Sequence, residues 1–464
     1  MKSAMAGIGG MSALHAYGQH PASANKPLRV ALIGCGGGRG IPVLLPEACK
    51  EQVVALVDAD SQQIKNALGV VNKHASPAAA EKIKTYTDYR KMFDEMGKEI
   101  DAVMIATPNH HHALPAILAA RRGIHVYVEK PLTLTIAEAR QVAAEVKKHG
   151  VASQLGNHGH SNEGVRRLCE YVWAGAIGQV SEVHCWSDRA NGLPGGARPP
   201  VAPVPEGLEW EQWIGPAPFR DYHPGLHRHS WHRWCDFGNG SIGNMGSHII
   251  DPAYWALKLG SPIAVEIEEM AGGGSEYYSV STRIRWDFPA REGMTPVKLY
   301  WYDGLAKGQV HSNQTVGNID CVVRAAQNRP PLVTELEKKY ERTFDDNGSL
   351  FVGDKGFMVM GPFGDGCRIV PEEAHRATPR PPATLPRIRG THQADFFRAC
   401  RGGPAACANL DYAGPLSEIV LLGSLAMRAG PGKRIEWDAA GMRCTNHPEL
   451  NNYVTLPARD GWSA

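Results

Sequence analysis

The sequence predicts an α/β protein of two domains: a doubly wound parallel sheet, followed by an α+β domain with a large, mostly antiparallel open sheet. Three observations lead to this prediction. The first part alternates short apolar β runs with helical segments, which is the pattern of βαβ units. Between residues 264 and 302, three β runs follow one another without helices, as in an antiparallel sheet. At 464 residues, the chain is also too long for one ordinary domain.

The chain begins with a segment that does not resemble the rest of the fold. Residues 1–17 are small and mostly apolar, and Ala22-Ser23-Ala24 fits the A-x-A pattern of a signal-peptidase site. Glycines interrupt the apolar run, so a disordered tail is the alternative. If residues 1–25 are a signal peptide, we expect a periplasmic or exported protein, and otherwise a cytoplasmic one.

The next elements form a nucleotide-binding pattern. Residues 27–33 are a β run, residues 41–50 read as a helix, and residues 53–57 are a second strand that ends at Asp58. Between the first strand and the helix stand Gly34, Gly36, Gly38, Arg39 and Gly40. Glycines let the backbone approach a pyrophosphate, and the helix N-terminus offers unpaired N–H groups. This order is typical of a Rossmann domain.

The acid at the end of the second strand indicates which dinucleotide binds. Asp58 would accept a hydrogen bond from the ribose 2′-hydroxyl, whereas its carboxylate would repel a 2′-phosphate. We therefore expect NAD rather than NADP as the cofactor. The spacing departs from G-x-G-x-x-G, because Arg39 occupies the third glycine position and Gly40 follows it. A glycine run by itself is also compatible with a flexible surface turn.

A further βαβ unit lies at residues 100–132. Continuous apolar runs at 102–106 and 124–128 flank a helical segment at 113–122, so both strands should be buried on both faces. Ligands of such sheets bind beyond the carboxyl ends of the strands. The two ends are Thr107-Pro108-Asn109 and Glu129-Lys130-Pro131. The sequence therefore places a candidate site at these two tripeptides.

The remaining elements complete the two domains. An amphipathic helix at 136–149 and a strand at 151–156 close a parallel sheet of about six strands, and we place the NAD-binding Rossmann domain at residues 26–150. The second part contains a long proline- and glycine-rich excursion and a helix at 247–259. We expect residues 151–464 to form an α+β domain for substrate binding and oligomerisation.

Composition argues against several classes of partner. The formal net charge is +2, which gives no reason to expect nucleic acid or an anionic membrane. No apolar run approaches the roughly 20 residues of a membrane-spanning helix. The ten cysteines form no CxxC pair, and in a chain of this size we expect mostly buried free thiols.

Two side chains are candidates for proton transfer. Lys130 stands at the end of a buried strand, where it would be partly desolvated and able to hydrogen-bond a substrate hydroxyl. His248 is the candidate general base, because imidazole titrates near neutral pH, and Asn244 shares its helix face four residues earlier. The alternatives are a surface lysine and a structural histidine.

Two histidine tracts raise the question of a metal site. Consecutive side chains point in different directions, so His110, His111 and His112 cannot chelate together, and the tract at 227–232 lacks the carboxylates or cysteines of a closed zinc site. We therefore expect no metal. The aromatic segment Trp231-His232-Arg233-Trp234 is interpreted as a carbohydrate-stacking or cofactor-covering loop, and a core aromatic cluster is the alternative.

Taken together, these motifs resemble the Gfo/Idh/MocA oxidoreductases, which include glucose–fructose oxidoreductase and inositol dehydrogenase. The resemblance rests on the glycine turn, on the two tripeptides with His112, and on residues 243–251. Residues 351–356 and 175–180 also resemble elements of that family. The similarity extends over the chain from about Pro27 onward.

The resemblance implies a Rossmann domain with a nicotinamide cofactor and an open C-terminal sheet that often serves in oligomerisation, so a homo-oligomer is expected. It implies that Lys130 is the catalytic lysine and His248 the acid/base histidine. The family commonly has an aspartate where this chain has Asn244. The implied cofactor-binding residues include Thr107, Pro108, Asn109, His112, Glu129, Lys130 and Asn157. The implied substrate-binding residues are Lys130, Arg233, Trp234, Asn244 and His248.

These observations lead to three functional hypotheses. The first is NAD-dependent oxidation of a sugar or glycoside hydroxyl by hydride transfer to nicotinamide, with Lys130 and His248 moving the proton. The second is a redox-assisted glycoside hydrolase with retained NAD, which oxidises, eliminates, adds water and returns the hydride. The third is a non-catalytic sugar- or NAD-binding protein, because Asn244 cannot carry the charge of an aspartate. The site is expected in the cleft between the domains.

Overall fold

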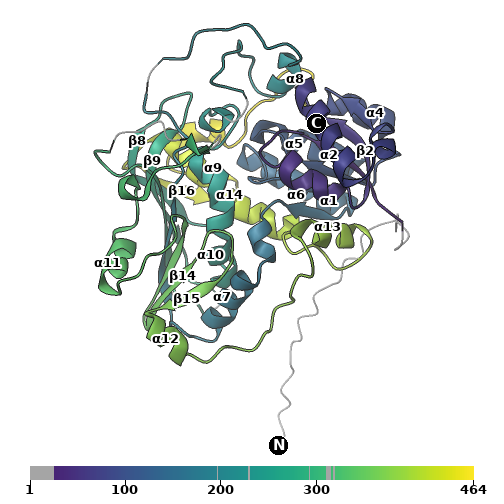
Figure 1. Cartoon of the computed structure of the whole chain (residues 1–464). Coiled ribbons are helices and arrows are strands. Elements are labelled where there is room, and N and C mark those ends of the chain that lie inside the picture. Colours follow the sequence, from purple (N-terminus) through teal and green to yellow (C-terminus); the bar gives the residue numbers. More distant parts are fainter. Residues whose placement is uncertain (1–25, 196, 228–229, 292, 310–314, 317–318) are drawn as a thin grey trace, which may run out of the picture.

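Two β-sheets and their covering helices make up the described part of the chain: residues 26–195, 197–227, 230–291, 293–309, 315–316 and 319–464 of a computed structural model. In Figure 1 the purple and blue N-terminal elements surround one sheet, and the second sheet lies beside it among teal and green elements. The leader predicted at residues 1–25 lies outside the described residues and stays a prediction.

The first sheet contains, within the described residues, six parallel strands in the order β3-β2-β1-β4-β5-β6. The strands are β1 (Arg29–Ile33), β2 (Gln52–Val57), β3 (Lys84–Tyr86), β4 (Ala102–Ile105), β5 (His125–Val128) and β6 (Ser153–Leu155). Their apolar side chains, such as those of Val30, Leu32 and Val103, are fully buried, because helices cover both faces of a parallel sheet. The predicted doubly wound sheet is confirmed. The strand order reverses between β1 and β4, which is where ligands bind such sheets.

The helices around this sheet begin and end close to the predicted positions. They are η1 (Gly40–Leu44), α1 (Leu45–Ala48), α2 (Ser61–His74), α3 (Pro77–Ala80), α4 (Tyr89–Met96), η2 (Asn109–His111), α5 (Ala113–Arg121), α6 (Ile136–His149) and η3 (His158–Ser161). The helix predicted at 41–50 is a π-helical turn, η1, that passes into the short α1. In α6, Thr135 and Glu138 form a capping box, and left-handed Gly150 ends the helix.

The second sheet has nine strands in the described residues, in the order β15-β14-β13-β7-β10-β9-β8-β16-β17. They are β7 (Val180–Ser187), β8 (Ala264–Gly272), β9 (Ser279–Phe288), β10 (Val297–Gly304), β13 (Gly348–Gly353), β14 (Gly356–Met360), β15 (Cys367–Val370), β16 (Arg434–Asp438) and β17 (Arg443–Cys444). Only the β7–β10 pair is parallel among these neighbours. The predicted, mostly antiparallel sheet is therefore confirmed, although the five strands after residue 340 were not predicted.

Helices pack on both faces of this sheet. The remaining elements are α7 (Glu163–Trp173), α8 (Trp210–Ile214), η4 (Ser230–Arg233), α9 (Gly240–Ile249), α10 (Asp251–Ala256), β11 (Thr315–Val316), β12 (Ile319–Asp320), η5 (Arg324–Ala326), α11 (Pro331–Lys339), α12 (Glu372–Ala377), α13 (His392–Cys400), α14 (Leu410–Ala429) and η6 (Pro448–Tyr453). The helices α9 and α14 join one core cluster, and α11 joins another with Trp186 and Tyr302. Both α9 and α14 contact elements of the second sheet, and α14 also packs against α6. Among the described residues, no helix has the length and apolar character needed to cross a membrane.

The helix that carries His248 begins earlier than predicted. The sequence indicated residues 247–259, but α9 starts at Gly240 and a new helix, α10, starts at Asp251 with Pro252 in its first turn. Glycine has a low helix propensity, which hides the first turns in the sequence. The structure uses this lack of a side chain, because a Cβ on Gly246 would lie 3.2 Å from Val420 of α14. Close packing of α9 on α14 therefore explains Gly246.

The chain returns to the first domain near its end. Phe396 and Cys400 of α13 join the same core cluster as Leu28 and Leu44, and α13 lies below α1 and α6 in Figure 1. The ten cysteines are free thiols, and most are buried, as expected.

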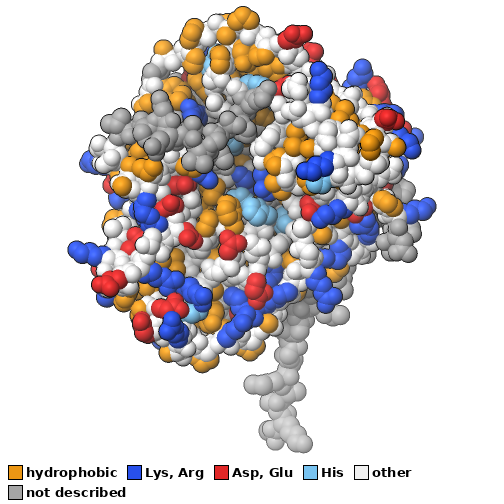
Figure 2. All heavy atoms as spheres, in the orientation of Figure 1, with side chains coloured by type: hydrophobic (Ala, Val, Ile, Leu, Met, Phe, Trp, Pro, Cys, Tyr) orange, Lys and Arg blue, Asp and Glu red, His pale blue; other side chains and the backbone are white. Residues whose placement is uncertain are grey.

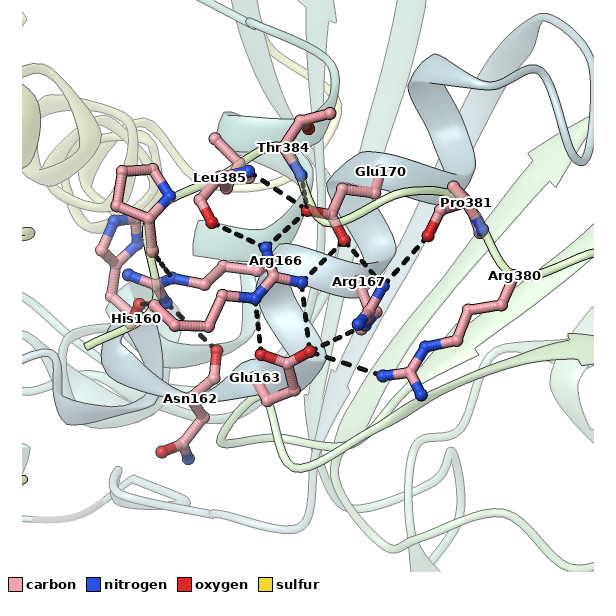
Figure 3. A network of polar contacts seen from close by, with 12 residues as sticks. His160, Asn162, Glu163, Arg166, Arg167, Glu170, Arg380, Pro381, Thr384 and Leu385 are labelled. Atoms are coloured by element: carbon pink, nitrogen blue, oxygen red, sulfur yellow. Dashed lines mark hydrogen bonds and ion pairs between the residues drawn. The ribbon is translucent and has the colours of Figure 1, made fainter. Parts of the chain in front are cut away.

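An ion-pair network fixes the extended link between α12 and α13 to α7 (Figure 3). Glu170 accepts hydrogen bonds from the backbone N–H groups of Thr384 and Leu385 and from the guanidinium of Arg387. The Arg387 guanidinium lowers the pKa of Glu170 to about 2. This network holds the link in place and so determines where α13 meets the first sheet.

Candidate active site

A cleft of about 920 Å³ lies at the carboxyl ends of the first-sheet strands and faces α9. Histidine side chains gather at the surface between the two halves of the molecule, as Figure 2 shows. The predicted site residues that line the cleft are Gly34, Gly36, Gly38, Arg39, Asp58, Thr107, Pro108, Asn109, His112, Glu129, Lys130, Asn244 and His248. The cleft therefore brings together the nucleotide-binding and the proton-transfer candidates.

The glycine turn forms one wall of the cleft from backbone alone. Gly34 has a positive φ of 90°, and a Cβ there would lie 2.6 Å from the backbone nitrogen of Thr107. A Cβ on Gly36 or Gly37 would meet no atom within 4 Å, so these two glycines face open space in the cleft. Gly40 does not line the cleft but starts η1. This arrangement leaves room for a pyrophosphate against the backbone, as a dinucleotide requires.

Asp58 is held rigidly at the end of β2. One carboxylate oxygen accepts the backbone N–H of Cys35 at 2.7 Å, and the other accepts the N–H of Asp60 at 2.9 Å. These two bonds tie the glycine turn to the strand end and fix the direction of the carboxylate. The residue therefore fits a ribose hydroxyl.

Arg39 connects the glycine turn to the second tripeptide. Its Nε donates to Glu129 Oε1 at 3.1 Å, and its Nη2 lies 3.5 Å from Nδ1 of His158. Glu129 is buried, and its second oxygen has no hydrogen-bond partner in the described residues. Arg39, which occupies the third glycine position, therefore neutralises the buried carboxylate of Glu129.

Lys130 is anchored by α9. Its ammonium donates to the backbone oxygen of Asn244 at 2.7 Å and to the side-chain Oδ1 at 3.1 Å. The Nδ2 of Asn244 in turn donates to Asn191 Oδ1 at 3.0 Å. Burial lowers the pKa of Lys130 to about 8, with Glu129 opposing this and Arg39 adding to it. An ammonium has three N–H donors, so one remains for a ligand in the cleft.

His248 has its ring fixed from the opposite side. Its Nδ1 lies 3.0 Å from the amide oxygen of Asn157, which can only accept a hydrogen bond, so Nδ1 carries the proton. The other ring nitrogen, Nε2, then holds a lone pair. Burial, followed by the charge of Lys130, lowers the pKa of His248 well below its ordinary range. The ring is therefore a neutral proton acceptor.

The ring of His112 connects the two tripeptides. Its Nδ1 lies 2.8 Å from the carbonyl oxygen of Pro131, and its Nε2 lies 2.9 Å from that of Thr107. Asn109 donates through Nδ2 to Asn239 Oδ1 at 2.8 Å, just before α9. These contacts align both strand ends with the helix that carries His248.

The described residues between 188 and 239, which we call the aromatic cap, lie against the nucleotide end of the cleft. The backbone N–H of Ser61 donates to Gly207 at 2.9 Å, and that of Glu209 donates to Ala59 at 2.8 Å, directly after Asp58. Large aromatic side chains of the cap form a separate cluster with Trp210, Trp213, Trp231, Trp234 and Phe237. The cap is therefore hydrogen-bonded to the strand end that would hold the ribose.

Two histidines of the first tract, His110 and His111, bind the backbone of this cap. His110 and His111 both direct Nε2 to the carbonyl oxygen of Trp213, at 3.0 and 2.9 Å. Burial lowers the pKa of both rings. The described residues contain no group of three or more His, Cys, Asp or Glu side chains placed to hold a metal ion, while His229 of the second tract lies outside them.

Besides Gly40, three predicted site residues do not line the cleft. Trp234 is 1% exposed and donates through Nε1 to Gly225, so it belongs to the cap core. Arg233 and Asn157 are also absent from the cleft wall, although Asn157 orients His248. Trp231 and His232, next to the predicted pair, line the cleft instead.

Other cleft residues were not identified from the sequence. His158 directly follows Asn157 at the carboxyl end of β6, and the strand-end rule that found Lys130 would have found it too. Phe363, Arg189 and Trp462 also line the cleft. Phe363 and Trp462 stand in long-range loops, and no local motif marks them.

Two sequence models of one oxidoreductase family match the chain. The first, described as an NAD-binding Rossmann fold, matches residues 28–157, and the second, a C-terminal alpha/beta domain, matches residues 184–288. The levoglucosan dehydrogenase of Pseudarthrobacter phenanthrenivorans is 26% identical over 202 residues, which are 43% of this chain and 44% of that protein. The 2,7-anhydro-N-acetylneuraminate hydratase of Mediterraneibacter gnavus is 34% identical over 92 residues, 20% of this chain and 24% of that protein. These alignments span less than half of each relative.

Solved structures share the whole fold. The WlbA dehydrogenase of Bordetella pertussis, in complex with NADH and UDP-GlcNAcA, superimposes with a TM-score of 0.55 at 14% identity, over 89% of this chain and 99% of that one. The glycine turn, the fixed aspartate and the open backbone wall fit the NAD of the first family model. The chain therefore belongs to the Gfo/Idh/MocA family of oxidoreductases, and its N-terminal sheet is an NAD-binding Rossmann domain.

Proposed function

We propose that this protein oxidises a secondary hydroxyl of a sugar or glycoside, with NAD as the hydride acceptor. One observation carries the proposal: Lys130 of the first domain and His248 of the second converge on the same cleft, one as a donor and the other as an acceptor. The levoglucosan dehydrogenase and the other sugar-directed relatives support the choice of substrate class.

The nucleotide end of the cleft would hold the cofactor. Gly34, Gly36 and Gly37 would face the pyrophosphate, and Asp58 would accept from the ribose. NAD, when bound, supplies the hydride acceptor for the carbon that is oxidised. The aromatic cap would limit the access of water to this end of the cleft.

At the catalytic end of the cleft, His248 and Lys130 would act on the same substrate hydroxyl. His248 accepts the hydroxyl proton at Nε2, because its Nδ1 proton is committed to Asn157. Lys130 uses its remaining N–H to hydrogen-bond the same oxygen and stabilises the negative charge that develops there. Asn244 holds the ammonium in place without a charge of its own. In this chain the neutral amide of Asn244 therefore holds Lys130, whose pKa is lowered, where a carboxylate would otherwise pair with the lysine.

A second candidate function is the redox-neutral cleavage of a glycoside or anhydro-sugar with retained NAD. The alignment with 2,7-anhydro-N-acetylneuraminate hydratases favours it, as does the cap that is hydrogen-bonded beside Asp58. In this reaction the hydride would return to the sugar after elimination and water addition. Net NADH would then not accumulate.

A panel of sugars distinguishes these functions. Purified protein with NAD is mixed with inositol, levoglucosan, free aldoses, aryl glycosides and 2,7-anhydro-N-acetylneuraminate, and NADH absorbance and sugar products are followed together. Net NADH formation supports the oxidoreductase. Aglycone release or hydration without net NADH supports the second function. Absence of both, together with no measurable NAD binding, would contradict both and leave a binding protein.

A further inference from the structure

A second histidine stands beside His248 in the cleft. His158 begins η3, directly after β6, and lines the cleft without being fully buried. Its ring lies 4.9 Å from the ring of His248, edge to face, and stacks on Phe363 at 5.0 Å. The mechanism above does not use it.

Arg39 determines which nitrogen of this ring carries the proton. Its Nη2 approaches Nδ1 of His158 at 3.5 Å, and a guanidinium has no lone pair to offer, so Nδ1 must be the acceptor. The proton of the neutral ring is therefore on Nε2. Burial, followed by the charge of Arg39, lowers the pKa of His158 to about 4; Lys130 adds to this and Glu129 opposes it. His158 stays neutral across the ordinary working range.

The two neighbouring rings therefore have opposite tautomers. His248 is protonated at Nδ1 and offers a lone pair at Nε2, whereas His158 accepts at Nδ1 and offers an N–H at Nε2. A lone pair suits the hydroxyl that must give up its proton. An N–H suits a neighbouring oxygen that only has to accept a hydrogen bond.

We propose that His158 is a specificity-determining residue that donates through Nε2 to an oxygen on the carbon next to the one that is oxidised. This inference rests on the proposed oxidation of a hydroxyl and narrows its substrate class. The substrate must carry oxygens on adjacent carbons, as sugars, cyclitols and their glycosides do. The second oxygen can be a hydroxyl, an ether or a glycosidic oxygen, because only its lone pair is used.

The first test combines a substrate change with a side-chain change. The panel sugar that reduces NAD fastest is compared with its monodeoxy analogues, in wild type, His158→Ala and His158→Gln. We expect His158→Ala to lower kcat/KM for the parent sugar about 10- to 100-fold. With the wild-type protein, one of the deoxy analogues should show a loss of similar size relative to the parent sugar. The two losses should not multiply, because each removes the same hydrogen bond.

The glutamine variant and a methyl ether sharpen this test. His158→Gln retains an N–H donor and should recover most of the loss, and the wild type should tolerate a methyl ether at the position where it rejects the deoxy analogue. If His158→Ala reduces kcat/KM for the parent and for every deoxy analogue by the same factor, the proposal is overturned. His149→Ala, at the partly exposed end of α6, is the matched control and should leave all ratios unchanged.

The second test needs no substrate. Nitrogen-15 NMR of the histidine rings is recorded on the NAD-saturated protein, and the His158 signals are assigned by their loss in His158→Gln. We expect a neutral ring with the proton on Nε2 between pH 6 and 8. A ring protonated at Nδ1, or charged at pH 7, would overturn the proposal. A panel in which no sugar reduces NAD would instead contradict the proposed function, so the two failures remain distinguishable.

Discussion

The two ends of the cleft are built in different ways. At the nucleotide end, the binding surface is backbone, and a single stretch from Gly34 to Asp58 supplies both the glycines and the acid. At the catalytic end, the surface is side chains from three separate segments: Lys130 after β5, Asn157 after β6, and Asn244 with His248 on α9. One end depends on local conformation and the other on how two domains meet.

This difference predicts how each end responds to substitution. A backbone site tolerates side-chain changes that leave the turn intact, so single substitutions there should alter affinity more than chemistry. The catalytic end depends on a chain of hydrogen bonds in which each member orients the next. Single substitutions there should alter the rate or its pH dependence while cofactor binding persists.

The largest effect is expected for Lys130→Ala. Loss of the ammonium removes the donor that stabilises charge on the reacting oxygen, and kcat/KM should fall by about 10³-fold. Binding of NAD, followed by fluorescence titration, should change little, because no contact of the glycine turn or Asp58 is lost. Lys298→Ala, on an exposed strand position, is the control. Equal losses in turnover and NAD affinity would contradict the separation of the two ends.

A smaller and opposite pattern is expected for Asp58→Ala. The substitution removes an acceptor for the ribose and a charge that repels a 2′-phosphate, so the dissociation constant for NAD should rise about 10- to 100-fold. The preference for NAD over NADP should narrow, while kcat at saturating cofactor stays near the wild-type value. Asp94→Ala, an exposed acid on α4, serves as the control. An unchanged NAD preference would remove Asp58 from cofactor selection.

The difference between the two ends of the cleft also explains which features could be predicted from the sequence. Strand, glycine turn, helix and terminal acid are contiguous, so the Rossmann domain, its cofactor and Asp58 follow from local pattern. The second sheet was predicted only as far as β10, because the later strands are shorter, at two to six residues each. The start of α9 was hidden by Gly240, Gly243 and Gly246: Gly240 has a positive φ of 63°, and Gly246 allows close packing on Val420.

The side-chain contacts of the site were beyond sequence reasoning for a physical reason. Lys130 and His248 were predicted from the sequence, and both line the cleft. Their roles in proton transfer stay predictions. The contacts that surround them join distant residues, since Asn157–His248 and Arg39–Glu129 are each separated by about 90 positions of sequence. Trp234 was predicted to contact the substrate, yet its side chain is buried in the core of the aromatic cap. Only the fold decides which aromatic of such a segment faces the cleft.

A third prediction concerns the anchor of Lys130. In Asn244→Asp, a carboxylate would stand about where Oδ1 now accepts from the ammonium at 3.1 Å. An opposite charge favours the protonated lysine, so its pKa should rise from about 8 by roughly one unit or more. Because the ammonium is the active form in the proposed mechanism, kcat/KM falls as pH rises through this pKa. The fall should therefore move to higher pH in the variant.

The pH profile of kcat/KM between pH 6 and 10 measures this shift. Asn244→Ala is the matched control, because it removes the hydrogen bond without adding a charge and should not move the inflection upward. A profile that is identical in wild type and Asn244→Asp would mean that Lys130 does not titrate in the rate.

The smallest effect is expected at the residue that touches both ends. Arg39 stands in the glycine turn, but its charge faces Glu129 and lowers the pKa of Lys130. Arg39→Met should therefore raise the pKa of Lys130, in the same direction as Asn244→Asp but by less, since burial is the larger cause of the low pKa and Glu129 already opposes it. NAD affinity should fall only a few-fold, because the backbone wall remains. Arg29→Met breaks a similar arginine–carboxylate pair, with Asp101, outside the cleft and should change neither quantity. A large loss of NAD affinity with an unchanged pH profile would mean that Arg39 acts only in cofactor binding. The charge at the nucleotide end would then have no influence on the pKa of Lys130.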